Sequence, residues 1–160
     1  MAKTQPIRIG LVGIGRAGWG MHCTELEALK DYFRIVAACD LDPERTGRMA
    51  ERYGCRVYDR VEDLVRDPEV ELVDVATRSR THVPHALLAL RAGKHVFQEK
   101  PIGVTYGDAR KLLAAQGRSE GRVYCRHNRR TEAAFQHVLE IIASGVLGQV
   151  YEARLRAGGY

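Results

Sequence analysis

The sequence has no apolar run close to the roughly 20 residues that a membrane-spanning helix needs. Its first residues enter a strand-like stretch directly, without the apolar core of a secretory signal peptide. Cysteine is scarce, and no two cysteines form a C-x-x-C pair, so we predict neither a disulfide framework nor a metal site. We therefore expect a cytoplasmic protein with reduced, buried thiols. The cysteines are Cys23, Cys39, Cys55 and Cys125.

A strong charge of one sign is also missing, because the formal net charge is only +5 and the basic residues are mostly scattered. The one basic cluster is R-H-N-R-R at 126–130. Nucleic-acid binding usually needs a basic face together with a recognisable module, and we find no such module. The cluster is either a solvated turn or a site for phosphate or carboxylate within a cleft.

Short apolar runs alternate with helical patterns over most of the chain. Strands buried on both faces of a parallel sheet appear as continuous apolar runs, and alternation with helices is typical of this architecture. The sequence therefore predicts an α/β fold with a doubly wound parallel sheet. The expected strands are 7–12, 35–39, 56–58, 72–76, 95–97 and 123–125.

Capping residues indicate where several helices begin and end. Pro43 suits the first turn of a helix over 43–53, and Thr81 is expected to cap a helix that Gly93 ends. Thr105 and Asp108 form a T-x-x-D start for a further helix. Two other segments, from the glycine-rich loop to residue 30 and at 61–66, are also predicted to be helical.

The pattern changes after Arg130. Phe135, Val138, Leu139 and Ile142 share one helix face, and Gly145 and Gly148 bracket a tight connection. From Gln149 the alternation has period two, which predicts a half-buried strand; one face carries Tyr151, Ala153, Leu155 and Ala157.

A lone strand is not stable in water, and its open edge would seek a partner. We therefore expect a complete domain over 1–126 and, over 127–160, the hinge, helix and first strand of a truncated α+β domain. The last strand is expected to form a homo-oligomer.

The strand at 7–12 leads into G-x-G-x-x-G, with a helix expected after it. In a dinucleotide-binding loop the first glycine permits a tight turn, the second admits a pyrophosphate, and the third lets the helix approach the strand. The helix N-terminus then offers free N–H groups to phosphate. The alternative is a glycine-rich turn without a ligand. The loop residues are Gly13, Ile14, Gly15, Arg16, Ala17 and Gly18.

Asp40 ends the second apolar run, 22 residues after Gly18. An acidic residue at about this distance binds the ribose hydroxyls in dinucleotide-binding folds. Its charge would repel the extra phosphate of NADP, by about 4 kcal/mol for unit charges 4 Å apart at an effective dielectric of 20. We therefore expect NAD, with NADP possible if Arg45 neutralises the phosphate.

Three further segments give the chain a family resemblance. They are A-T-x-x-x-x-H from Ala76 to His82, G-K-H-V-x-x-E-K-P from Gly93 to Pro101, and N-x-R at 128–130 followed by G-x-L-G-x-V at 145–150. With the glycine loop, they resemble the Gfo/Idh/MocA family of glucose–fructose oxidoreductase and inositol dehydrogenase relatives. The resemblance implies a nicotinamide-dependent oxidoreductase acting on a sugar, cyclitol or related polyol.

The resemblance also implies roles for individual residues. Lys100 would lie beside the nicotinamide and the reacting carbon as the catalytic residue. The Lys100–Pro101 peptide bond that follows it is often cis in the family. A cation there stabilises the negative charge that hydride transfer places on oxygen. Glu99 would orient the site or contact the cofactor. The alternative for Glu99 and Lys100 is a polar strand end before a proline turn.

Other cofactor contacts follow from the same resemblance. Thr77 would approach the cofactor, although Arg78-Ser79-Arg80 departs from the family pattern after it. His82 would also be a site residue, whereas His85 is expected to be structural. Asn128 and Arg130 would contact cofactor or substrate, or only pack at a hinge.

The family supplies its second catalytic group from a later segment, so the resemblance implies that these 160 residues alone are inactive. A different class of function stays open. The chain can instead be a stand-alone nucleotide-binding or protein-interaction module whose last strand docks on another polypeptide.

Overall fold

The computed structural model describes residues 5–154 and 156. It divides into two compact units, one ending at Arg126 and the other beginning at His127. No helix in the described part of the chain has the length and apolar character needed to cross a bilayer.

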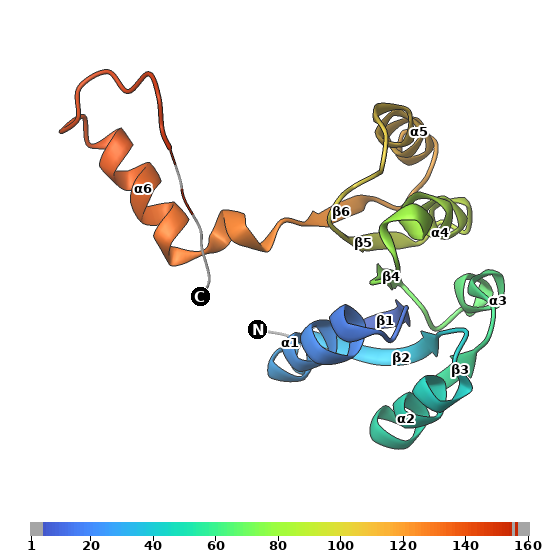
Figure 1. Ribbon diagram of the computed structural model, residues 1–160. Helices are drawn as coiled ribbons and strands as arrows, with labels where there is room; N and C mark the ends of the chain where they lie inside the picture. Colours follow the sequence, from blue (N-terminus) through green and yellow to red (C-terminus); the bar gives the residue numbers. More distant parts are fainter. Residues whose placement is uncertain (1–4, 155, 157–160) are drawn as a thin grey trace. The chain divides into compact units, whose positions relative to one another are not determined.

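The first unit is built on one parallel sheet of six strands in the order β3-β2-β1-β4-β5-β6 (Figure 1). This order confirms the predicted doubly wound fold, because the chain moves outward from β1 in one direction and then returns to continue in the other. The strands are β1 (Ile7–Val12), β2 (Phe33–Cys39), β3 (Arg56–Tyr58), β4 (Leu72–Val75), β5 (His95–Glu99) and β6 (Val123–Arg126).

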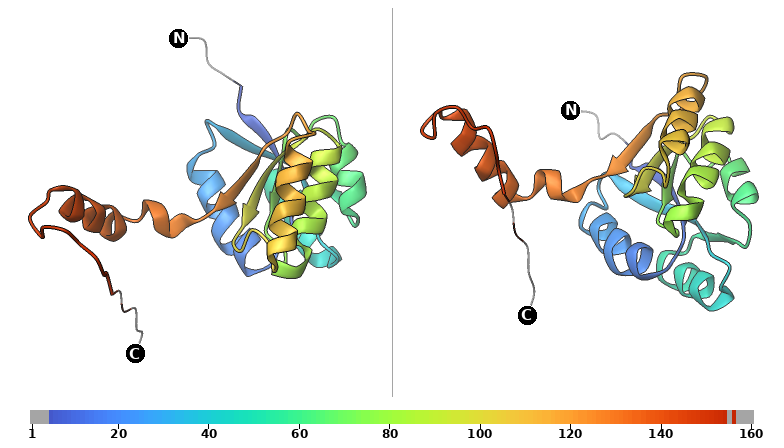
Figure 2. Two further views of the ribbon diagram at one scale, coloured as in Figure 1. Left: turned by 90° about the horizontal axis from the view of Figure 1, so that it is seen from above. Right: turned by 45° about the horizontal axis from the view of Figure 1, so that its top comes forward.

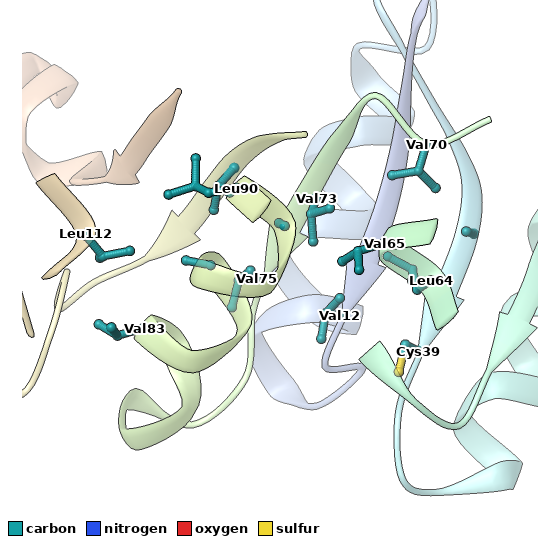
Figure 3. Close-up of a cluster of buried hydrophobic side chains, with 14 residues drawn as sticks. Val12, Cys39, Leu64, Val65, Val70, Val73, Val75, Val83, Leu90 and Leu112 are labelled. Carbon is teal, nitrogen blue, oxygen red and sulfur yellow. The ribbon is translucent and has the colours of Figure 1, made fainter. Parts of the chain in front are cut away.

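Helices cover both faces of this sheet (Figure 2). One core cluster joins the sheet to α3, α4 and α5, and a second joins it to α1 and α2. Figure 3 shows the first cluster, in which Leu64, Val83 and Leu90 from the helices meet valines of β1 and β4. The helices are a π-helical turn η1 (Gly18–His22), α1 (Cys23–Ala28), α2 (Pro43–Tyr53), α3 (Val61–Arg66), α4 (Ser79–Arg91) and α5 (Tyr106–Gln116).

Most of the expected helix boundaries are confirmed. Pro43 is the first residue of α2, after Asp42 as N-cap, and Thr105 and Asp108 form a complete capping box at α5. The start of α4 was predicted incorrectly, because this helix begins at Ser79 rather than after Thr81. The Thr81 hydroxyl donates to the carbonyl of Arg78, within the first turn, instead of capping the helix.

Gly10 explains how closely α3 approaches the middle of the sheet. A Cβ at this position would lie 2.8 Å from Leu64 Cδ2 and 3.0 Å from a methyl carbon of Val70. Such distances are shorter than any ordinary carbon contact. The missing side chain in β1 therefore allows the Leu64 side chain to pack directly on the strand backbone.

The second unit contains η2 (Asn128–Thr131), a 3₁₀ turn, and α6 (Ala133–Ala143). Gly145 and Gly148 both have positive φ, and the Gly148 amide donates to the Gly145 carbonyl, so the expected tight connection is present. The strand expected from Gln149 is absent from residues 149–154 and 156. Alternation alone does not form a strand without a partner, and none pairs with it among the described residues. Leu155 and Ala157 lie outside the described residues.

All four cysteines are free thiols, three of them buried and Cys125 half-buried. Burial raises the pKa of Cys39 to about 12 and that of Cys55 to about 11. Both thiols therefore stay protonated and act as small apolar core residues.

Candidate functional site

The glycine-rich loop joins the end of β1 to the helix that begins at Arg16. Gly13 has φ of +91°, and its amide donates to the Cys39 carbonyl, which ties the turn to the end of β2. A Cβ on Gly18 would lie 2.0 Å from the Gly13 carbonyl oxygen. Only glycine at position 18 therefore permits the helix to pack against the loop.

Gly15 differs from its neighbours because its missing side chain faces open space. A Cβ there would meet no atom within 4 Å, so packing within the protein does not require glycine. Open space over bare backbone is what a closely approaching ligand needs. The helix begins at Arg16, immediately after Gly15. The N–H groups of its first turn have no partner within the helix.

Asp40 lies at the end of β2 and contacts this loop. Its Oδ2 accepts a 2.7 Å hydrogen bond from the Ile14 amide, and its Oδ1 accepts one from the Asp42 amide at 3.0 Å. Arg45 is also close, with Nη1 3.6 Å from Asp40 Oδ1 and Nε 3.2 Å from Asp42 Oδ2. The carboxylate is thus held at the loop while keeping free lone pairs.

Thr77 follows β4 and lies against the glycine loop. Its Cγ2 would be only 2.7 Å from a Cβ on Gly13, so the two turns are in direct contact. The Thr77 hydroxyl lies 2.9 Å from the Thr81 hydroxyl and 3.3 Å from His85 Nδ1. This arrangement fixes the loop after β4 beside the loop after β1.

His82 is buried, with both ring nitrogens facing backbone carbonyls. Nδ1 is 3.0 Å from the Pro101 carbonyl oxygen, and Nε2 is 3.0 Å from that of Thr77. The ring therefore braces the loop after β4 against the loop after β5. Because its side chain is only 1% exposed, His82 holds the site's backbone rather than presenting a free imidazole.

Glu99 ends β5 and Lys100 follows it, and the two side chains have contrasting surroundings. The Lys100 side chain is exposed, and the Lys100–Pro101 peptide bond is cis, as the resemblance implied. Glu99 is buried, and its carboxylate accepts from the Lys100 amide at 3.0 Å and from Arg126 Nη1 at 2.9 Å. Its Oε1 also lies 3.2 Å from His22 Nε2.

A buried polar network that the sequence analysis missed begins at these contacts. His22 Nδ1 lies 2.8 and 2.9 Å from the two carboxylate oxygens of Asp74 on β4. Arg126 on β6 continues the network to Glu25 on α1. The available signal was Asp74 itself, a carboxylate inside the apolar strand L-V-D-V, which must find a partner to be buried.

The ionisation of this network follows from its burial and its pairing. Burial acts to lower the pKa of His22, but the hydrogen bond and charge of Asp74 and the bond to Glu99 outweigh it and raise that pKa. Burial raises the pKa of Asp74. Burial opposes ionisation of Glu99 too, yet the hydrogen bond to His22 and the charge of Arg126 lower its pKa.

The structure brings most of the expected residues to one edge of the sheet. The glycine loop, Asp40, Thr77 and Lys100 all follow the carboxyl ends of neighbouring parallel strands. Asn128 and Arg130 lie in η2 of the second unit, with exposed side chains, and their assignment as site residues stays a prediction.

An open parallel sheet with a glycine loop at the β1–β4 switch point and an acidic residue after the neighbouring strand β2 defines a dinucleotide-binding Rossmann domain. Comparison with known proteins agrees. Residues 7–127 match an oxidoreductase family with an NAD-binding Rossmann fold, and the chain belongs to this family, Gfo/Idh/MocA. The family's NAD-binding Rossmann fold confirms the expected cofactor, NAD.

Two curated relatives are named as inositol dehydrogenases. The chain is 37% identical to inositol 2-dehydrogenase of Rubrobacter xylanophilus over 91% of its own length and 42% of the relative's. It is 28% identical to myo-inositol 2-dehydrogenase of Thermotoga maritima, covering 93% and 44%. The chain thus spans about two fifths of these relatives.

A solved structure shows the same fold with ligands. The WlbA dehydrogenase of Bordetella pertussis, in complex with NADH and UDP-GlcNAcA, superimposes with a TM-score of 0.87 at 27% identity. The match covers 94% of this chain and 43% of that one. The open space at Gly15 and the partly free Asp40 carboxylate fit such a dinucleotide.

Proposed function

We propose that this chain is the nucleotide-binding part of an NAD-dependent dehydrogenase or reductase that acts on a sugar, cyclitol or related polyol. The observation that carries the proposal is the 2.7 Å hydrogen bond from the Ile14 amide to Asp40. It joins the backbone suited to a diphosphate to the carboxylate suited to the adjoining ribose.

The loop residues bind the cofactor in this proposal. The loop over 13–18 holds the diphosphate. Its Gly13 and Ile14 amides are bonded to Cys39 and Asp40, so the donors are the amides from Gly15 onward at the start of the helix, and the bare backbone of Gly15 permits close approach. Asp40 accepts hydrogen bonds from the ribose hydroxyls through its remaining lone pairs. Thr77, beside Gly13, lines the same edge.

Lys100 is the proposed catalytic residue. When bound, the nicotinamide would donate a hydride as NADH or accept one as NAD⁺. The ammonium group of Lys100 stabilises negative charge on the substrate oxygen, or passes it a proton. Its exposure at the end of β5, next but one to β1 in the sheet, supports this role. Glu99 and His82 are buried, so we assign them to holding the Lys100 and Thr77 backbones rather than to direct contact with cofactor.

The remaining expectations complete the proposal. Asp40 favours NAD over NADP by charge repulsion, while Arg45 is already paired with Asp40 and Asp42. The exposed side chains of Asn128 and Arg130 add contacts to cofactor or substrate. We further propose a cytoplasmic homo-oligomer that assembles through the segment after Gln149.

Cofactor binding is testable with a probe that the chain already contains. Trp19, the single tryptophan, lies four residues after Gly15, with the Arg48 guanidinium 3.9 Å from its ring centre. Bound NADH should quench Trp19 emission and should itself emit more strongly through energy transfer from Trp19. Calorimetry should give the same NADH affinity as the fluorescence titration. A folded chain that binds neither NADH nor NAD by both methods would refute the proposal.

The role of Lys100 needs a separate measurement. Lys100→Met should leave NADH affinity within about threefold and lower turnover by at least about 100-fold, the usual scale of a lost general acid. Turnover is measured on the product of the complete open reading frame, with a panel of cyclitols and sugars. Unchanged turnover would remove Lys100 from the mechanism without affecting the assignment of the loop.

A further inference from the structure

The network around His22 connects the two halves of the proposed site. His22 ends η1, the turn that continues directly from the glycine loop, and it reaches Glu99, the residue before Lys100. The residues of the network come from five elements: η1, α1, β4, β5 and β6. Arg126, also buried, makes a second connection of this kind, through Glu25 of α1 and Glu99 of β5.

The π-helical turn explains why His22 faces inward. The Cys23 amide bonds to the Gly18 carbonyl, an i→i−5 bond that adds one residue to the turn. One extra residue rotates the following side chains by about 100° relative to a regular helix. His22 is thereby buried at 2% exposure between two carboxylates instead of lying along the helix surface.

The proton count of this arrangement is constrained. A neutral imidazole donates from one nitrogen only, yet both nitrogens of His22 face carboxylate oxygens. Both contacts are hydrogen bonds only when two protons occupy them, either both on the ring or one on the ring and one on Asp74. The raised pKa values of His22 and Asp74 have the same consequence, a retained proton.

With His22 protonated, the charges along the network alternate in sign. Asp74 approaches from β4, Glu99 from β5 and the Arg126 guanidinium from β6, and Arg126 in turn pairs with Glu25 of α1. The centre of the Phe97 ring lies 6.1 Å from that of the His22 ring. A protonated His22 thus completes a row of alternating charges with a net charge of −1, whereas a neutral one leaves Glu99 held by Arg126 and the Lys100 amide alone.

We propose that His22 is a positioning residue for the redox site: with its proton shared with Asp74, it fixes the Glu99 carboxylate, which in turn fixes the backbone from which Lys100 extends. The inference rests on the proposed role of Lys100. Its direct prediction is that the Lys100 amide responds to the state of a side chain 78 positions earlier in the chain. Glu99 transmits that response through its 3.0 Å bond to the amide.

The test uses ¹⁵N NMR of the chain without cofactor. The Lys100 amide should resonate downfield, as expected for an amide bonded to a carboxylate, and should shift with the same midpoint as the His22 ring nitrogens when pH rises. In His22→Gln, which donates to one carboxylate and cannot be protonated, the downfield position should be lost. Asp74→Asn, which leaves the ring in place, should shift the same amide.

The matched control is Asp67→Asn. Asp67 is a buried carboxylate that accepts from Arg56, Tyr58 and the Glu69 amide, and it shares no residue with the His22 network. It should lower thermal stability without moving the Lys100 amide. A Lys100 amide that ignores both His22 titration and the two network variants would overturn the proposal. Because NADH binding is measured separately through Trp19, failure here is distinguishable from failure of the proposed function.

Discussion

The Ile14 amide donates a 2.7 Å hydrogen bond to the carboxylate of Asp40, so two segments 26 residues apart in the chain form one surface. The contact fixes the end of β2 beside the loop after β1. It gives Asp40 two tasks, one within the fold and one toward a ribose. The two tasks can be separated by experiment, because an amide side chain keeps an acceptor oxygen while losing the charge.

Asp40→Asn should change the choice of cofactor more than the fold. Removing the carboxylate charge removes repulsion toward the extra phosphate of NADP, which is at most about 4 kcal/mol at 4 Å. After discounting for solvent, the ratio of NADPH to NADH affinity should rise at least tenfold, or about 1.4 kcal/mol. Parallel titrations followed by Trp19 emission measure this ratio. An unchanged ratio would show that Asp40 does not face the adenosine ribose.

Gly15→Ala should weaken NADH binding without destabilising the chain. The added Cβ meets nothing within 4 Å in the protein, so the free energy of unfolding should stay within about 0.5 kcal/mol of wild type. NADH affinity should fall at least about tenfold, because the methyl group occupies the diphosphate's approach. Gly47→Ala, in α2 and equally open, is the control that should retain binding. Equal NADH affinity in both variants would place the diphosphate elsewhere.

Gly18→Ala should instead damage the fold. Its Cβ would lie 2.0 Å from the Gly13 carbonyl oxygen, which is backbone and cannot rotate away. We expect the free energy of unfolding to fall by at least about 1–3 kcal/mol, the usual range for overpacking. Gly20→Ala, two residues further on with nothing within 4 Å, should be neutral or gain up to about 1 kcal/mol. Urea denaturation distinguishes the pair; similar midpoints would contradict the close approach at Gly18.

The stability that the His22 network provides should depend on pH. Because the pKa of His22 is raised on folding, its contribution is complete below its unfolded value of about 6.5 and is lost as pH rises through the folded value. Because the pKa of Glu99 is lowered, its contribution is present above about 4.3 and is lost as pH falls through the folded value. For His22 and Glu99 together, the contribution is therefore greatest between about pH 4.3 and 6.5.

His22→Gln should cost about 3–5 kcal/mol in that window, as expected when one partner of a buried ion pair is removed. The difference from wild type in thermal unfolding should shrink as pH rises above about 6.5. Asp67→Asn should show no such decline over the same rise. A His22→Gln deficit that stays constant with pH would mean that the ring is neutral throughout.

Local chemistry made most of the fold predictable. The apolar runs gave β1 and β3 with the observed bounds, and Asp42-Pro43 and Thr105 with Asp108 mark helix starts through contacts within three residues. The start of α4 was predicted incorrectly because the Thr81 hydroxyl does not cap backbone amides. It lies within hydrogen-bond distance of the Arg78 carbonyl oxygen and the Thr77 hydroxyl instead.

The His22 network could not be predicted in the same way. Its contacts join residues 52 and 77 positions apart, and they depend on a π turn that a helical period of 3.6 does not anticipate. The strand expected after Gln149 failed for a related reason, since a strand is defined by its partner and not by its own alternation. The residues that hold the site's backbone are thus less visible in sequence than those expected to touch a ligand.

Gly10 in β1 has a consequence for anyone who collects inactive variants of this segment. Substitutions at positions 10, 13 and 18 collide with neighbouring atoms of the protein itself, whereas one at position 15 does not. Loss of function across the glycine-rich stretch would therefore have two causes: some variants would misfold, and others would fold but fail to bind the coenzyme. Only position 15 reports on the coenzyme alone, so a genetic screen should be calibrated there before its other hits are interpreted.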